Sequence, residues 1–324
     1  MSGCERPPGD DAEARWSGPV QSRGMRGLVG VTLLLAALAG CGGKTAGGTP
    51  KASDDSGSAG DGVATSDGVG TTDGAGTCSE VLFGKPGAHT GLDATRCAPR
   101  CGCGDTMWQP RGWSDADLAE LRAWQLVDPP ALPAVDPYTA ATLDVAPPPT
   151  GAVCAVALEA ADERRYRLLD FATAAEAAAA NTTVTHTGRC GLCSSLADLA
   201  VYAGTSDLTD PVRQCGLLQI ADGFDASVVC LQKLGFSPPC ATIWAYNTAN
   251  TRKLCLGDCM ALLKAPSHRE DGSLNACLAC DEDKSGPVFK AVAGRTRRNS
   301  GLPSALCRPC AGVAKVDHMY LFLK

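Results

Sequence analysis

The stretch HTGRCGLCSS, residues 186–195, places two cysteines three positions apart, immediately before a predicted helix. That helix is expected over 194–204, because a serine can cap its first turn and the leucines that follow recur at helical spacing. Two thiols in this position have four interpretations: a redox pair, half of a metal site, a nucleophile beside a bonded cysteine, or the ends of two structural disulfides. The compartment of the protein and its number of cysteines decide which interpretation is favoured.

The N-terminal part carries the signal for the compartment. In MRGLVGVTLLLAALAGCGGK (25–44), basic residues precede an apolar run over 28–39, which is too short to cross a bilayer core that needs ~20 residues. The run ends in LAGC (38–41), which resembles the lipobox of bacterial lipoproteins. The resemblance implies that 1–41 is a lipoprotein signal peptide, cut before Cys41, whose sulfur carries a diacylglycerol and whose amino group is acylated.

Acylated Cys41 makes the lipid bilayer the expected partner, since two or more acyl chains give stable anchoring. Gly42 follows the cysteine where some relatives have Asp, so the resemblance implies the outer membrane of the cell envelope, with the ectodomain in the periplasm or at the cell surface. Three acidic residues within 10–13 suit the start of a signal peptide poorly, so Met25 is an alternative start of translation, and the sequence leaves the choice open.

The remaining chain divides by composition. Residues 42–77 are rich in Gly, Ser, Thr and Asp and are expected to form a disordered tether. A cysteine-rich lobe with one helix is expected over 78–128, a Pro-rich connector over 129–150, and a cysteine-rich α+β domain over 151–324. The net charge of −6 and the lack of a long basic run argue against nucleic acid as a partner.

Cysteine arithmetic favours disulfides. The chain has 18 cysteines, and setting aside Cys4 and the lipidated Cys41 leaves 16 in an oxidising compartment, which predicts eight bridges of undetermined connectivity. Helices are expected over 113–127, 174–181, 194–204, 211–221, 224–235, 238–263 and 287–294, with strands over 153–159, 164–171, 182–186 and 314–324. The predicted fold class is therefore α+β, helix-dominated and disulfide-rich.

Three alternatives to structural bridges remain open. Cys277/Cys280 with Cys307/Cys310 could supply four thiolates to zinc, but their separation is long for a zinc ribbon, and no metal is expected. The pair Cys190/Cys193, between a predicted strand and a helix, resembles the active-site turn of the thioredoxin family, which implies a reducible redox pair.

The third alternative is a hydrolase. The order C-G-x-C at a helix start resembles papain-like cysteine proteases, which implies Cys193 as the nucleophile and His318, which lies in a predicted strand, as the base. A free Cys193 would leave another cysteine without a partner, so structural bridges are favoured. Whether the protein is an enzyme stays undetermined.

One further cluster could bind an anion. Arg295, Arg297 and Arg298 fall together after a predicted helix, and guanidinium groups bind carboxylates and phosphates in a bidentate manner. The alternative is that these arginines pair with the acidic residues at 281–283.

Residues 186–310 as a whole are similar to uncharacterised secreted cysteine-rich proteins. The expected function is thus a membrane-anchored cell-envelope lipoprotein whose ectodomain is a binding or structural module, with an unidentified protein or small molecule as ligand. No P-loop, Rossmann glycine pattern, HExxH or GxSxG motif occurs, and no cofactor is expected.

Overall fold

The computed structural model describes residues 78–323, except 79, 104, 141, 142, 144, 145, 161 and 162. The signal peptide, the lipidated Cys41 and the tether at 42–77 lie outside the described residues. The described residues belong to one compact unit. The eight disulfides of the described residues and their main hydrophobic core lie within this unit, so we expect residues 64–324 to fold without the preceding segment.

The fold is α+β, as the sequence predicts. Its helices are α1 (Asp115–Ala123), α2 (Ala174–Ala179), α3 (Leu196–Gly204), α4 (Thr209–Asp222), α5 (Phe224–Lys233), α6 (Pro238–Ala261), α7 (Ala276–Lys284) and α8 (Gly286–Ala293). The strands are β1 (Leu82–Phe83), β2 (Cys97–Ala98), β3 (Cys101–Cys103), β4 (Thr106–Trp108), β5 (Gln125–Leu126), β6 (Val153–Ala160), β7 (Arg165–Phe171) and β8 (Thr183–Thr187). Short 3-10 turns follow at Arg298–Ser300 and Cys310–Gly312.

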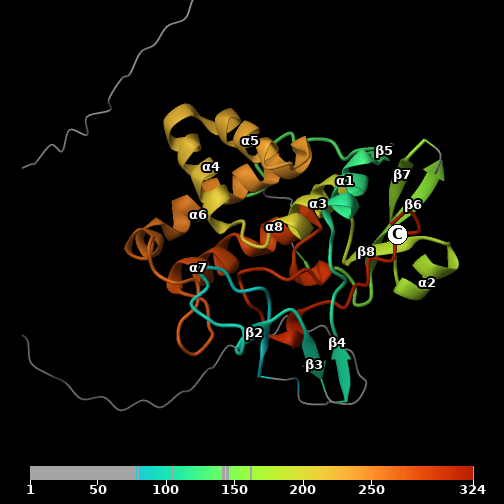
Figure 1. Ribbon diagram of the computed structural model, residues 1–324. Coiled ribbons are helices and arrows are strands. Elements are labelled where there is room, and N and C mark those ends of the chain that lie inside the picture. Colours follow the sequence, from blue (N-terminus) through green and yellow to red (C-terminus); the bar gives the residue numbers. More distant parts are fainter. Residues whose placement is uncertain are drawn as a thin grey trace, which may run out of the picture. The chain divides into compact units, whose positions relative to one another are not determined.

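The main sheet has four strands in the order β5-β7-β6-β8. Strand β6 pairs with β7 and with β8 in antiparallel fashion, and β5 joins β7 in parallel. Two small two-stranded sheets, β1-β2 and β3-β4, complete the strand content of the described residues. Helices α4, α5 and α6 lie together on the side of the unit away from the main sheet (Figure 1).

Local sequence explains where several helices begin. Ser114 caps α1 in a capping box with Asp117, Ser195 caps α3, and Ser237 caps α6 with a proline following it. Asp198, in the first turn of α3, also accepts hydrogen bonds from the backbone N–H and the hydroxyl of Ser237, each at 2.8 Å. The two helix starts are thereby joined through one buried carboxylate.

Some element predictions were wrong. Helix α4 was expected to begin at residue 211 but begins at Thr209 with Leu208 at its N-cap, so Asp210 lies inside the helix, where it pairs with Arg213. Residues 314–323 form no strand, because His318 adopts a positive φ of 52° and the Tyr320 N–H bonds back to the His318 carbonyl. Helix α7 was not predicted, since its sequence, ACLACDEDK, lacks a clear apolar stripe.

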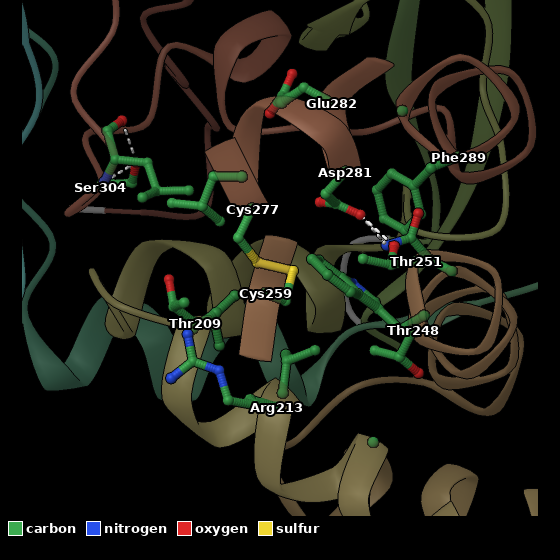
Figure 2. Close-up of a pocket in the computed structure, with 18 of the residues that line it drawn as sticks. Thr209, Arg213, Thr248, Thr251, Cys259, Cys277, Asp281, Glu282, Phe289 and Ser304 are labelled. Carbon is green, nitrogen blue, oxygen red and sulfur yellow. Dashed lines mark hydrogen bonds between the residues drawn. A yellow bond between two sulfur atoms is a disulfide. The ribbon is translucent and has the colours of Figure 1, made fainter. Parts of the chain in front are cut away.

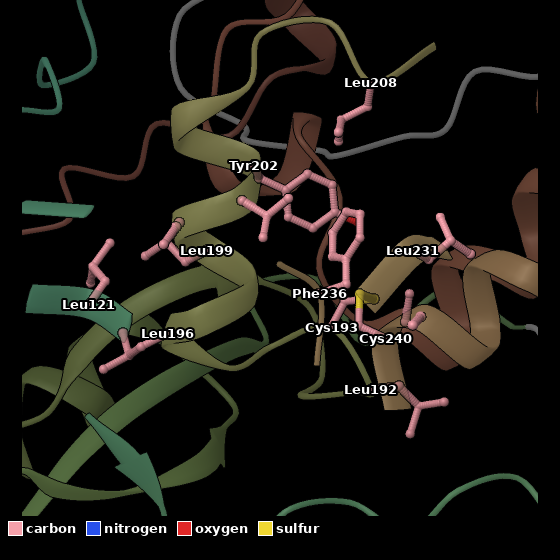
Figure 3. Close-up of a cluster of buried hydrophobic side chains, with 14 of the residues drawn as sticks. Leu121, Leu192, Cys193, Leu196, Leu199, Tyr202, Leu208, Leu231, Phe236 and Cys240 are labelled. Atoms are coloured by element: carbon pink, nitrogen blue, oxygen red, sulfur yellow. A yellow bond between two sulfur atoms is a disulfide. The ribbon is translucent and has the colours of Figure 1, made fainter. Parts of the chain in front are cut away.

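One core joins the segments on either side of the Pro-rich connector. Leu118 and Leu121 of α1 belong to the same buried cluster as residues of α3, α5, α6 and α8 (Figure 3). Strand β5 pairs with β7, and two disulfides, Cys97–Cys307 and Cys101–Cys310, tie the 78–128 segment to the C-terminal part. The Pro-rich connector is therefore a boundary in the sequence, but the segments before and after it share one hydrophobic core.

The predicted number of disulfides is confirmed. All sixteen cysteines from Cys78 onward are paired, the other bridges being Cys78–Cys103, Cys154–Cys190, Cys193–Cys240, Cys215–Cys230, Cys255–Cys280 and Cys259–Cys277. Eight bridges indicate an extracellular or otherwise oxidising compartment. Within the described part of the chain, none of the helices combines the length and the apolar character needed to span a bilayer.

Candidate functional site

The two cysteines of CGLC are bonded to different partners. Cys190 is bonded to Cys154 of β6, and Cys193 is bonded to Cys240 of α6. The redox interpretation needs a bond between Cys190 and Cys193, and the structure does not have it. The arrangement is the one expected for structural bridges, in which this turn links the sheet to the longest described helix.

The zinc interpretation is likewise not supported. Cys277, Cys280, Cys307 and Cys310 belong to four different disulfides, so none carries a thiolate that could bind a metal. Among the described residues, one trio of possible ligands lies within 4.8 Å, namely Cys154, Asp170 and Cys190. Its two sulfurs are bonded to each other, which removes them as ligands in this state.

The hydrolase interpretation requires a free thiol at Cys193, which the disulfide to Cys240 removes. His318 is 1% exposed, its Nε2 lies 2.8 Å from the Ser300 carbonyl, and its Nδ1 lies 3.3 Å from the Tyr320 hydroxyl. None of the contacts of His318 in the described chain involves Cys193. The pair is therefore not assembled as a nucleophile and base.

Arg295 is part of the core and not of an anion site. Its side chain is fully buried, and its guanidinium donates to the carbonyls of Thr185, Cys193 and Ser194 and to the hydroxyls of Thr185 and Ser300. These bonds hold the turn at CGLC against β8. The hypothesis of an anion site at Arg295 is wrong, because every guanidinium nitrogen has a partner within the protein.

Arg297 caps a helix. Its guanidinium donates to the carbonyls of Tyr202 and Thr205 at the end of α3, and also lies over the Tyr202 ring. The last carbonyls of a helix have no partner within the helix, so this arginine satisfies them. Burial lowers the pKa of Arg297 to about 10.

Arg298 alone of the three retains an accessible guanidinium. It donates to Glu282 Oε2 at 2.7 Å, and Arg308 donates to Glu282 Oε1 at 2.5 Å. Arg298 thus pairs with one of the acidic residues at 281–283, as the alternative interpretation predicts, and Arg308 binds the other oxygen of the same Glu282 carboxylate. The sequence analysis did not identify Arg308. This arginine lies between Cys307 and Cys310, and that pair of cysteines is the signal that could have marked the loop as held in place by disulfides.

Buried histidines make the stability of this region sensitive to acid. Burial lowers the pKa of His186 well below 6.5, and that of His318 to about 3. The unfolded chain therefore binds more protons than the folded chain once the pH falls below about 6.5. Each histidine is then expected to lower the free energy of unfolding by up to about 1.4 kcal/mol per pH unit. Burial raises the pKa of Asp198 and of Asp281. Protonation of these two carboxyl groups therefore increases the free energy of unfolding as the pH falls, which opposes the effect of the histidines.

We expect the urea concentration at the midpoint of unfolding to decrease as the pH is lowered from 7.5 to 5. A His318→Gln variant should show a shallower fall than the parent chain, because one of the two titrations is removed. An equally steep decrease in the parent chain and in the His318→Gln variant would contradict a neutral His318 in the folded state.

A cavity of about 550 Å³ lies among α4, α6, α7, α8 and the loop at 296–308 (Figure 2). Apolar side chains dominate its lining. They come from α4 (Val212, Leu217, Ile220), α6 (Trp244, Leu256, Met260), the turn after α6 (Leu263), α7 (Leu278), α8 (Phe289) and the loop segments at 208 and 302–306 (Leu208, Leu302, Leu306). The Cys259–Cys277 disulfide lies in the middle of the view and links two of the walls.

Several of these lining side chains are unusually exposed for their type. Leu217 and Ile220 of α4 are 58% and 62% exposed, and Leu256 and Met260 of α6 are 51% and 59% exposed. Their spacings of three and four residues place each pair on one face of its helix. Apolar groups gathered at the mouth of a cavity are typical of a binding surface.

A polar group interrupts the apolar lining. Asp281 of α7 accepts hydrogen bonds at Oδ1 from the Thr251 hydroxyl and from Asn247 Nδ2, the second at 3.3 Å. The Tyr138 hydroxyl donates to Asn247 Oδ1 at 2.7 Å, which orients the amide. Oδ2 of Asp281 makes no hydrogen bond with any described residue, so it remains available to a group inside the cavity.

Comparison with known proteins gives one match. A model described as a family of unknown function (DUF8771) matches residues 224–316. The matched segment contains α6, α7, α8, Glu282, Arg298 and Arg308, but not α4, so it covers most of the cavity wall. No curated protein and no solved structure matches the chain.

Proposed function

We propose that this protein is a lipid-anchored envelope lipoprotein whose ectodomain binds a small molecule with an apolar body in the cavity between α4 and α6–α8. The observation that carries the proposal is the cavity itself, about 550 Å³ in volume and lined mainly by aliphatic and aromatic side chains. Small-molecule sites in proteins have volumes of roughly 300–1,000 Å³ and the same mixture of apolar lining with a few polar groups.

The disulfides support a preformed site. Cys255–Cys280 and Cys259–Cys277 connect α6 to α7 at two successive turns, and Cys215–Cys230 connects α4 to α5. Cross-linked walls lose little conformational freedom when a ligand binds, which favours affinity. A purely structural module would need the same bridges, but it would not need exposed leucines around a hollow.

The anchor rests on the sequence. The LAGC segment ending at Cys41 supports acylation, and the eight disulfides support passage to an oxidising compartment. Incorporation of labelled palmitate into the protein, and its loss in a Cys41→Ser variant, tests the anchor independently of the cavity.

Blocking the cavity mouth tests ligand binding. Residues 64–324 would be titrated with dodecanol, with the fluorescence of Trp244, which lines the cavity, as the readout. A Met260→Asp variant places a charge at the apolar mouth and should weaken binding by roughly tenfold or more, because a bound alkyl chain would have to displace water from the new carboxylate.

Leu321→Asp is the matched control, since Leu321 is 88% exposed and lies outside the cavity lining. The control variant should bind dodecanol as the parent does. If the parent shows no saturable binding, or if both variants weaken it equally, the cavity is not the site and the proposal fails.

A further inference from the structure

The charges around the cavity have the opposite sign to those of the whole chain. Six basic and three acidic side chains line it, whereas the chain as a whole has a net charge of −6. The basic residues are Arg213, Arg252, Lys290, Arg297, Arg298 and Arg308, and the acidic ones are Asp207, Asp281 and Glu282. A local excess of positive charge in an acidic protein indicates a preference for anionic ligands.

Arg298 and Arg308 are the two lining arginines whose guanidinium groups can bind a ligand. Each commits one terminal nitrogen to a different oxygen of Glu282, so two guanidiniums share one carboxylate. Their remaining nitrogens make no hydrogen bond with any described residue. The Arg308 side chain is only 15% exposed, and burial is the main cause of the lowered pKa of its guanidinium.

Three other arginines of the lining already have partners within the protein. Arg297 is occupied by the carbonyls at the end of α3, and Arg213 pairs with Asp210 at 2.7 Å. Arg252 donates to Gly216 O and to Gln219 Oε1. Two partly dehydrated guanidiniums with free donors therefore remain, beside an apolar cavity.

We propose that the ligand is an anionic amphiphile whose carboxylate or phosphate group binds Arg298 and Arg308 while its apolar chain lies against α4 and α6. This inference rests on the proposed function and specifies the ligand class of the same cavity. A guanidinium pair offers parallel N–H donors that match the oxygens of either oxyanion, and such charge-assisted bonds are about twice as strong as neutral ones. Glu282 neutralises the charge of one guanidinium, so the second guanidinium leaves a positive charge that can bind the anionic group of the ligand.

The first experiment compares head groups on one chain length. Residues 64–324 would be titrated with dodecanoate, dodecyl phosphate, dodecanol and dodecylammonium, each below its micelle concentration. We expect one or both anions to bind roughly tenfold or more tighter than dodecanol, since hydrogen bonds to charged groups contribute about twice as much as neutral ones. Dodecylammonium should bind more weakly than dodecanol, and the order of the two anions identifies the head group.

The two proposals fail in different ways. If none of the four probes binds, the cavity function itself fails. If dodecanol or dodecylammonium binds as tightly as the anions, the cavity function stands and the anion site is wrong.

Variants at Glu282 and Arg298 then locate the head group. Glu282→Gln removes the carboxylate that competes for both guanidiniums, so binding of dodecanoate should tighten, by roughly tenfold. Arg298→Gln should weaken it to a similar extent and leave dodecanol binding unchanged. Arg298 is 30% exposed, and this variant is expected to fold.

Arg189→Gln is the matched control, because Arg189 is an exposed arginine outside the cavity lining. It should leave the affinity for dodecanoate unchanged. Weaker dodecanoate binding in the Glu282→Gln variant, or unchanged dodecanoate binding in Arg298→Gln, would overturn the anion site.

Discussion

Replacement of Arg295 with methionine is expected to lower the free energy of unfolding by about 3–5 kcal/mol. The guanidinium donates to the carbonyls of Thr185, Cys193 and Ser194. These acceptors belong to the backbone, so they stay in the core whatever side chain stands at 295. Methionine fills similar space but donates nothing, so these buried oxygens lose their partners. Relief from burying a charge offsets only part of this cost.

Two variants frame this result. Arg189→Met, at an exposed arginine, should change stability by less than about 0.5 kcal/mol. Arg295→Lys keeps the charge, but a single ammonium cannot reach partners placed around a planar guanidinium, so we expect an intermediate loss. Urea unfolding of residues 64–324 measures all three variants. A loss below about 1 kcal/mol for Arg295→Met would mean that water can replace the guanidinium in the core.

Replacement of Gly191 with alanine is expected to destabilise the protein by about 3 kcal/mol or more. A Cβ at this position would lie 2.5 Å from the Val292 carbonyl oxygen and 2.6 Å from the Gly294 backbone nitrogen. These are backbone atoms, held by hydrogen bonds from Leu192 N to Val292 O and from Cys193 N to Ala293 O. The neighbouring segment cannot move away without breaking that contact.

Gly257→Ala is the matched control for this variant. Gly257 lies in α6, is exposed, and would meet no atom within 4 Å with an added Cβ. Alanine there should stabilise the protein by about 0.5–1 kcal/mol, because a glycine inside a helix is entropically costly. If Gly191→Ala were as stable as Gly257→Ala, the close approach of the two backbone segments would be wrong.

The sequence by itself determined those features that depend on short-range chemistry. Side-chain caps at Ser114, Ser195 and Ser237 located three helix starts, and the predicted strand pair at 153–159 and 164–171 located β6 and β7. The count of sixteen cysteines in an oxidising compartment gave the number of bridges. Each of these properties is fixed by neighbours in the chain or by composition, so no tertiary information is needed.

Only the tertiary structure decided what the singled-out residues do. The bonding of Cys190 to Cys154 and of Cys193 to Cys240 depends on which segments pack together, and connectivity of this kind is not written in cysteine spacing. The three adjacent arginines look alike in sequence, yet Arg295 is buried in the core, Arg297 caps α3 and Arg298 faces the cavity. A guanidinium takes its role from its surroundings, because burial and the positions of acceptors decide whether its donors are spent inside the protein or left for a ligand.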